Sequence, residues 1–153
     1  MFFLKELPTR QMLEKYHKNF PQMKVESVEA ALHLLRSASL LMRELDAYFA
    51  KKQLSQLRFL VLIVLDREPS CDGLMASEIA DRLDVSRPVT TRTLQTLQDD
   101  GMLEFANHGA DGRAKLVTLT SQGKQKLRNV LPGYYKVIED FMAEDRTSTL
   151  EKQ

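Results

Sequence analysis

The stretch DVSRPVTTRTLQTLQDDG, residues 84–101, has the signals of a helix but few residues for a hydrophobic core. Ser86 is of a type that caps helix N-termini, Pro88 suits a first turn, and Gly101 can end the helix. Between Ser86 and Gly101 lie two arginines, four threonines and two glutamines, but three aliphatic residues. Most of this predicted helix must therefore face something other than the protein interior.

On a helix, Leu94 and Leu97 form a narrow apolar stripe, which Val89 or Thr90 continues one turn earlier. Arginine can bridge guanine O6 and N7, glutamine can pair with adenine, and a threonine methyl can touch a thymine methyl. A solvated helix face is the alternative, but such a face usually carries lysine and glutamate. Threonine, a mediocre helix former, favours a binding role. The predicted DNA contacts are Ser86, Arg87, Pro88, Thr91, Arg92 and Gln95.

The segments around this helix predict the rest of a DNA-binding unit. Ser55 can cap a helix from 56 to about 67, which is apolar on every side and should be buried. A short helix within 75–83 and a tight turn follow. After Gly101 the apolar period changes to two, which predicts a β-hairpin formed by 103–107 and 115–120. Helix, turn, helix and hairpin in this order predict a winged helix.

The tip of the hairpin carries candidate side chains for the minor groove. Arg113 can enter a narrow groove, where the negative potential is enhanced, and Asp111 can hold its guanidinium. His108 and Lys115 lie nearby in the sequence. The alternative is that Asp111 only forms the turn and that Arg113 is solvated.

Apolar stripes that alternate three and four residues flank this unit on both sides, which is typical of helices packed along other helices. The first belongs to a helix from 27 to about 49, with Ser27 as expected cap. The second follows Ser121, the next expected cap, and Pro132 predicts a kink or a new helix start there. We expect a frayed tail from 144 to 153, and a short helix from Thr9 to about 16. Stripe residues include Val28, Leu35, Met42, Leu127, Val130, Tyr134, Val137 and Phe141.

Composition narrows the function classes. The chain has 153 residues, about one domain, and a formal net charge of +1, so bulk charge indicates no polyanion partner. No apolar run approaches the roughly 20 residues of a membrane span. The start, MFFLKELP, lacks the basic region of a signal peptide, and a single cysteine excludes an internal disulfide. A cytoplasmic protein without membrane contact is the simplest interpretation.

The sequence has no catalytic, cofactor or metal motif that we can identify. It lacks a glycine-rich phosphate loop, a nucleophile elbow and a paired-carboxylate cleft, so we expect no enzyme and no cofactor. His17, His33 and His108 are scattered, without metal-ligand spacing. Cys71 is a poor redox sensor, because Glu68 and Asp72 nearby would raise its pKa.

Three segments resemble the MarR family of bacterial transcriptional regulators. They are LSQLRFLVLIVL (54–65), ASEIADRLDVSRPVTTRTLQTLQDDGML (76–103) and DGRAKLVTLTSQGKQKL (111–127). The likeness spans roughly 27–141, and Asp111 and Arg113 match the family's wing-tip D-x-R motif. It implies a homodimer with intertwined terminal helices, a pseudo-palindromic DNA operator, and repression relieved by a small-molecule inducer or by oxidation. The stripe residues above then become the expected dimer interface.

The expected fold is mainly α with a small β-hairpin wing, an α+β winged helix-turn-helix between dimerisation helices. Its expected parts are an N-terminal extension with a short helix (1–26), an N-terminal dimerisation helix (27–53), the winged helix-turn-helix (54–120) and a C-terminal dimerisation region with a frayed tail (121–153).

Three features depart from the family pattern. Met75 stands where a capping threonine or serine is common, and Thr90 where an apolar residue is usual. Little chain follows Phe141 for a final dimerisation helix, and residues 1–20 are a candidate replacement. Two other functions stay open: a winged-helix module for protein–protein assembly, and an enzyme with an unrecognised site. An assembly module would show an apolar patch on the helix at 86–101.

Overall fold

The computed structural model describes residues 2–68, 73–108 and 114–150, with the backbone alone at 107, 108, 114 and 145–150. Predictions for Cys71, Asp111 and Arg113 lie outside the described residues. The chain divides into two compact units, Met1–Leu45 with Ile138–Gln153, and Asp46–Val137. We call them the terminal unit and the winged-helix unit.

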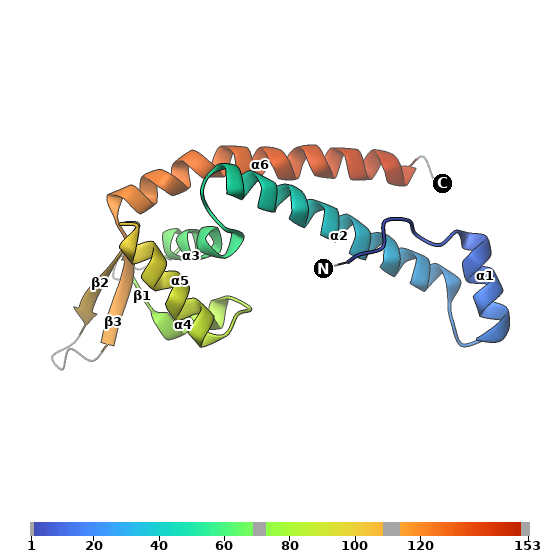
Figure 1. Cartoon of the computed structure of the whole chain (residues 1–153), viewed down its shortest axis with the longest axis horizontal. Helices are drawn as coiled ribbons and strands as arrows, with labels where there is room; N and C mark the ends of the chain where they lie inside the picture. Colours follow the sequence, from blue (N-terminus) through green and yellow to red (C-terminus); the bar gives the residue numbers. More distant parts are fainter. Residues whose placement is uncertain (1, 69–72, 109–113, 151–153) are drawn as a thin grey trace. The chain divides into compact units, whose positions relative to one another are not determined.

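The described elements follow the predicted order, with one added strand (Figure 1). They are α1 (Arg10–Asn19), α2 (Val25–Lys51), α3 (Gln56–Asp66), β1 (Leu74–Met75), α4 (Ala76–Arg82), α5 (Arg87–Asp99), β2 (Leu103–His108), β3 (Ala114–Leu119) and α6 (Ser121–Leu150). The protein is therefore mainly helical with a small sheet, as predicted. None of the helices in the described part of the chain has both the length and the apolar character that a membrane crossing needs.

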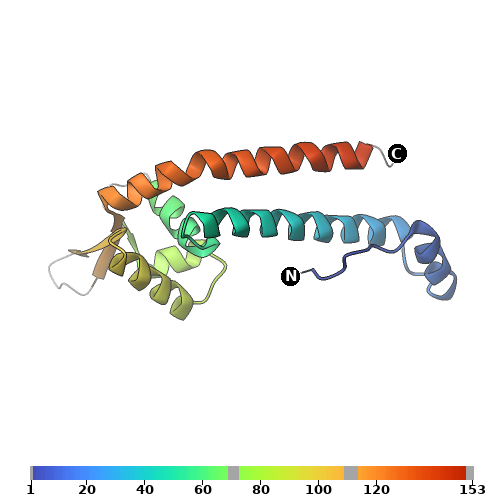
Figure 2. The same ribbon diagram turned by 45° about the horizontal axis from the view of Figure 1, so that its top comes forward.

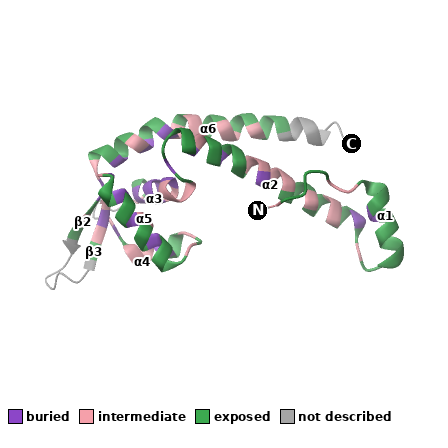
Figure 3. Ribbon diagram, in the orientation of Figure 1, coloured by how far each residue is buried: buried purple, intermediate pink, exposed green. Residues whose placement is uncertain are grey.

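The core of the winged-helix unit forms around α3. Most of its side chains are apolar, and Phe59, Val61 and Leu62 are almost completely buried. Figure 3 shows α3 largely in the colours of buried and intermediate residues. Helices α3, α4 and α5 contact one another, and α5 also contacts the hairpin (Figure 2). Burial of one such side chain contributes about 1.5–3 kcal/mol, so this core fixes where α5 sits in its unit. Other buried residues of this unit include Ile79, Leu94, Leu97, Leu103 and Val117.

The sheet has the order β1–β3–β2 and is antiparallel throughout. Phe105 and Leu74 both pair with Val117, on opposite sides of β3. Strand β1 was not predicted, because two residues show no periodicity. Gly73 leads into it with φ of +92°, and a Cβ there would lie 2.5 Å from the Val117 carbonyl oxygen. Glycine is required at this position for both reasons.

Two predicted caps are confirmed. The Thr9 hydroxyl accepts from the Met12 N–H at 3.3 Å, and the Ser55 hydroxyl accepts from the Arg58 N–H at 3.2 Å. Ser86 does occupy the N-cap position of α5, but its side chain makes no capping hydrogen bond.

Two other caps were wrong. Helix α2 begins at Val25, so Ser27 lies inside it. Helix α6 begins at Ser121, and the hydroxyl of the residue before it, Thr120, accepts from the Gly123 N–H at 3.0 Å.

The start of α4 is stabilised without a capping side chain at its N-cap, Met75. The backbone N–H of Met75 donates to the Glu78 carboxylate at 2.7 Å. That bond supplies half of a capping box, so this helix start is better satisfied than its sequence suggested.

Helix α6 is longer than the sequence indicated. It continues through Pro132, which excludes the new helix start expected there. It also continues past Phe141 to Leu150, so the frayed tail predicted from 144 onward was wrong for residues 144–150. A proline removes one backbone hydrogen bond, and the rest of the helix keeps its ladder.

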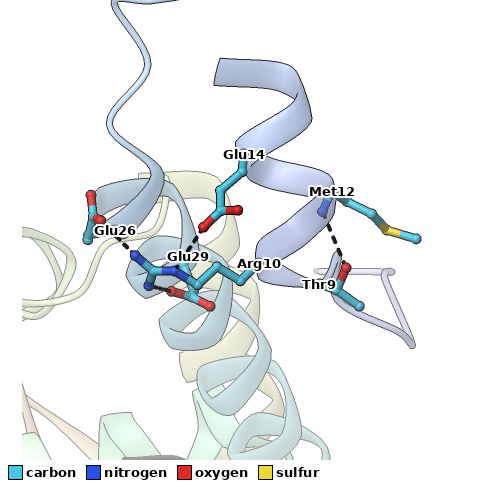
Figure 4. Close-up of polar contacts among 6 residues, drawn as sticks. All are labelled: Thr9, Arg10, Met12, Glu14, Glu26 and Glu29. Atoms are coloured by element: carbon cyan, nitrogen blue, oxygen red, sulfur yellow. Dashed lines mark hydrogen bonds and ion pairs between the residues drawn. The ribbon is translucent and has the colours of Figure 1, made fainter. Parts of the chain in front are cut away.

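In the terminal unit, α1 is held to the start of α2 by Arg10. Its guanidinium lies 2.8 Å from Glu26, 3.2 Å from Glu29 and 3.4 Å from Glu14 (Figure 4). The hydrogen bond to Glu26, followed by the charge of Glu29, raises the pKa of Arg10. A hydrogen bond to its own backbone, followed by the bond to Arg10, lowers the pKa of Glu26. The N-terminal extension is thus ion-paired to α2.

Candidate nucleic-acid interface

The exposed face of α5 forms a shallow depression. Its lining consists of Arg87, Pro88, Thr91, Arg92, Gln95 and Thr96, all exposed. Five of these six were predicted from the sequence as DNA contacts. Ser86 lies one residue before the helix and does not line the depression. Thr96 was missed, although it follows Arg92 by one helical turn and so shares its face.

The opposite face of α5 is anchored in the core by Leu94, Leu97 and Thr90, each at most 1% exposed. Thr90, and not Val89, completes the apolar stripe, since Val89 is 44% exposed. The Thr90 hydroxyl donates to the Ser86 carbonyl at 3.2 Å. This bond satisfies the buried hydroxyl and leaves the methyl group of Thr90 in the core, which explains how a threonine fits this buried position.

The two arginines on the exposed face differ from two other arginines of the same unit. Arg58 pairs with Asp100, and Arg82 pairs with Glu68. Within the part of the chain that is described, Arg87 and Arg92 make no ion pair, and the first turn of α5 has no acidic residue. The exposed face therefore carries two guanidinium groups beside a helix N-terminus, which is itself attractive to anions.

The threonines of α5 share one arrangement. Each hydroxyl donates to the backbone carbonyl four residues earlier. The donor–acceptor pairs are Thr90 to Ser86 at 3.2 Å, Thr91 to Arg87, Thr93 to Val89 and Thr96 to Arg92, the last three at 2.9 Å. Such bonds satisfy the hydroxyl hydrogen within the helix and fix the side-chain torsion.

Gln95 is also engaged within the helix. Its amide nitrogen donates to the Asp99 carboxylate at 2.9 Å and lies 3.4 Å from the Gln98 side-chain oxygen. A two-bonded contact between Gln95 and adenine would require the amide to leave Asp99. Arg87 and Arg92 have no such competing carboxylate among the described residues, so no ion pair has to break before their guanidinium groups can bind a ligand.

The C-terminal end of α5 is joined to α3 and to the start of α6. Asp100 accepts from Arg58, and its backbone carbonyl accepts from the Gln122 amide at 3.2 Å. The Thr120 hydroxyl donates to the Gly101 carbonyl at 2.7 Å. Gly101 has φ of +72°, a conformation that favours glycine after a helix. These bonds hold the C-terminal end of α5 in place within its unit.

The wing is described only at its base. His108 pairs with Ala114 in the last register position of the hairpin, and Lys115 is exposed. The depression and the described part of the wing belong to the same unit. Among the described residues, no group of three or more histidine, cysteine, aspartate or glutamate side chains could hold a metal ion.

A helix–turn–helix whose second helix exposes arginines, followed by a two-stranded hairpin that pairs with β1, defines a winged helix-turn-helix protein. Comparison with known proteins agrees: the sequence profile of the MarR family matches residues 52–114. Over this segment, which holds most of the winged helix-turn-helix, the chain is similar to the MarR family.

Two curated relatives cover nearly the whole chain. The HTH-type transcriptional repressor YetL of Bacillus subtilis (strain 168) is 28% identical over 139 residues, 91% of this chain and 83% of YetL. The transcriptional repressor MprA of Escherichia coli (strain K12) is 26% identical over 148 residues, 95% of this chain and 81% of MprA.

Among solved structures, the MarR family regulator Sco3205 of Streptomyces coelicolor, in complex with DNA, superposes with a TM-score of 0.72. It is 18% identical and covers 85% of this chain and 84% of its own, which shows the shared fold.

Proposed function

We propose that this protein is a homodimeric, sequence-specific DNA-binding regulator that represses transcription from a pseudo-palindromic operator and is released by a small molecule. The observation that carries the proposal is the exposed face of α5, where Arg87 and Arg92 lie without an acidic partner among the described residues. The relatives YetL and MprA are both named as transcriptional repressors, which supports repression over activation. Such a protein would act in the cytoplasm on DNA and would not be an enzyme.

The proposed contact places the N-terminal half of α5 in the major groove. Arg92 would bridge guanine O6 and N7, the commonest specific contact of this kind. Arg87, at the first position of the helix, would bind a phosphate or a second base. The wing residues His108, Asp111, Arg113 and Lys115 would contact the adjacent minor groove, as proposed from their sequence pattern.

The proposed dimer interface uses apolar side chains that one chain leaves exposed. On α2, Leu34 is 71% exposed, Leu35 50% and Met42 41%. Leu127 and Val130 are already 1% exposed within one chain and have no surface left for a partner. The interface proposal therefore keeps Val28, Leu35, Met42, Tyr134, Val137 and Phe141.

Residues 1–20 are proposed to extend that interface. This segment exposes Phe3, Met12 and Tyr16, while Arg10 holds α1 to α2. Deleting residues 1–20 should shift the dimer toward monomer in sedimentation equilibrium. An unchanged dimer would remove the extension from the interface.

Selection of bound duplexes from a random-sequence pool by the full-length protein tests the function. The proposal predicts an enriched palindrome whose half-site centres lie about one helical turn, roughly 34 Å, apart. Recovery of a single half-site would contradict the dimer. If no sequence is enriched, the DNA-binding function is wrong, and the winged-helix assembly module becomes the better reading.

A further inference from the structure

Thr91 has one property that the proposed DNA contact does not use. Its hydroxyl hydrogen is donated to the Arg87 carbonyl at 2.9 Å, although the side chain is exposed and lines the depression on α5. This bond fixes the torsion about the Cα–Cβ bond, so the methyl group is fixed as well. A ligand in the depression therefore meets a fixed methyl group at Thr91 and no free hydroxyl donor.

The surroundings of Thr91 make an apolar contact more favourable than a polar one. Pro88, which has no N–H and a rigid ring, lines the same depression, while Arg87 and Arg92 provide its donors. In the major groove of DNA, the one apolar group on a base edge is the C5-methyl of thymine. A fixed threonine methyl next to arginine donors is suited to a thymine that neighbours a guanine.

We propose that Thr91 is a specificity residue that recognises a thymine in each half-site through contact between its methyl group and the thymine C5-methyl. This inference rests on the proposed DNA-binding function. It adds what that function does not specify: the kind of base at one position, and the chemical group by which it is recognised.

The direct test replaces thymidine by deoxyuridine, one position at a time, in the duplex enriched from the random pool. Uracil keeps every hydrogen-bonding group of thymine and lacks the C5-methyl. Burial of one methyl predicts about fourfold weaker binding at the sensitive position in one half-site. Replacement in both half-sites predicts a loss on the order of 15-fold, since distant sites are additive.

Matched variants assign the effect to Thr91. Valine keeps a methyl group, replaces the hydroxyl by a second methyl, and has one strongly preferred side-chain torsion in a helix. Serine keeps the hydroxyl and lacks the methyl. Thr93→Ser is the control, because Thr93 makes the same hydroxyl–carbonyl bond at 2.9 Å but does not line the depression.

Thr91→Val should bind the thymine duplex within about twofold of the natural protein and keep its sensitivity to uracil. Thr91→Ser should bind about fourfold more weakly per half-site and lose that sensitivity. Thr93→Ser should behave like the natural protein. The inference is overturned if no thymine in the enriched duplex is sensitive to uracil, or if Thr91→Ser remains as sensitive as the natural protein. Failure to enrich any duplex instead overturns the proposed function, and the inference with it.

Discussion

The hydroxyl of Tyr48 donates a hydrogen bond to the backbone carbonyl of Val130, with 2.6 Å between the oxygens. This bond joins the C-terminal turns of α2 to the first half of α6 within the winged-helix unit. Gly133 lies directly against the tyrosine: a Cβ there would be 2.4 Å from the hydroxyl oxygen and 2.7 Å from the ring carbons Cε2 and Cζ. The contact therefore depends on the absence of a side chain at Gly133.

Gly133→Ala should destabilise the protein, although alanine is the better helix former by about 1 kcal/mol. The added methyl must displace the Tyr48 ring and break its bond to Val130. Overpacking of this kind costs about 1–3 kcal/mol. The measurement is the free energy of unfolding in urea.

Tyr48→Ala provides the control for that substitution. In the Tyr48→Ala background, Gly133→Ala should become neutral or stabilising, because the clash is gone and the helix propensity remains. If the glycine substitution is equally destabilising in both backgrounds, the close approach to Tyr48 is not its cause.

The same hydrogen bond predicts a dependence on alkaline pH. Burial raises the pKa of Tyr48 above its ordinary 10.0, against a smaller lowering by a backbone hydrogen bond. A raised pKa in the folded state contributes stability that is full below pH 10 and is lost as the pH rises through the folded-state value. Tyr48→Phe should therefore cost about 1 kcal/mol at pH 7, with a smaller difference from the natural protein above pH 10. A constant difference from pH 7 to 11 would contradict this account.

Arg10→Gln should release α1 from α2 without unfolding the winged-helix unit. The substitution removes the ion pairs to Glu14, Glu26 and Glu29. Hydrogen exchange at residues 10–19 should become faster, while exchange in α3 and α5 stays unchanged. Lys15→Gln removes the same charge from α1 at a position with no ion pair among the described residues, and it should leave the exchange of α1 as it was.

Acid should release α1 from α2 in the natural protein, as the Arg10→Gln substitution does. The pKa of Glu26 is lowered in the fold, so its contribution is present above its ordinary pKa of 4.5 and is lost as the pH falls through the folded-state value. Exchange at α1 should then rise below about pH 4.5 in the natural protein and change less in Arg10→Gln. Equal pH dependence in the two proteins would mean that the Arg10–Glu26 contact does not hold α1.

The sequence predicted the architecture wherever a periodic pattern was long. The mostly apolar α3, the Leu94–Leu97 stripe and the change to period two after Gly101 each correspond to an observed element. Strand β1 could not be predicted, because its two residues are extended only through pairing with β3. The start of α2 was predicted wrongly at Ser27, because a serine near a helix start is a possible cap whether or not the helix begins there.

The exposed face of α5 was predictable because polar residues recur there with the helical period. The internal bonds of its side chains were not. The donation from Gln95 to Asp99 is one choice among several that the spacing allows. The role of Thr90 in the core needed its buried neighbours and its bond to Ser86, neither of which the sequence displays.

The affinity of Arg92→Ala for the enriched operator and for a scrambled duplex, at one fixed salt concentration, tests the central claim most directly. If Arg92 bridges a base, the operator should lose about 1–3 kcal/mol of binding free energy while scrambled DNA loses little. Arg128→Ala, which removes an exposed arginine from α6, should change neither affinity by a comparable amount. If Arg92→Ala binds the operator as tightly as the natural protein, or weakens on both duplexes equally, the exposed face of α5 does not recognise sequence through Arg92.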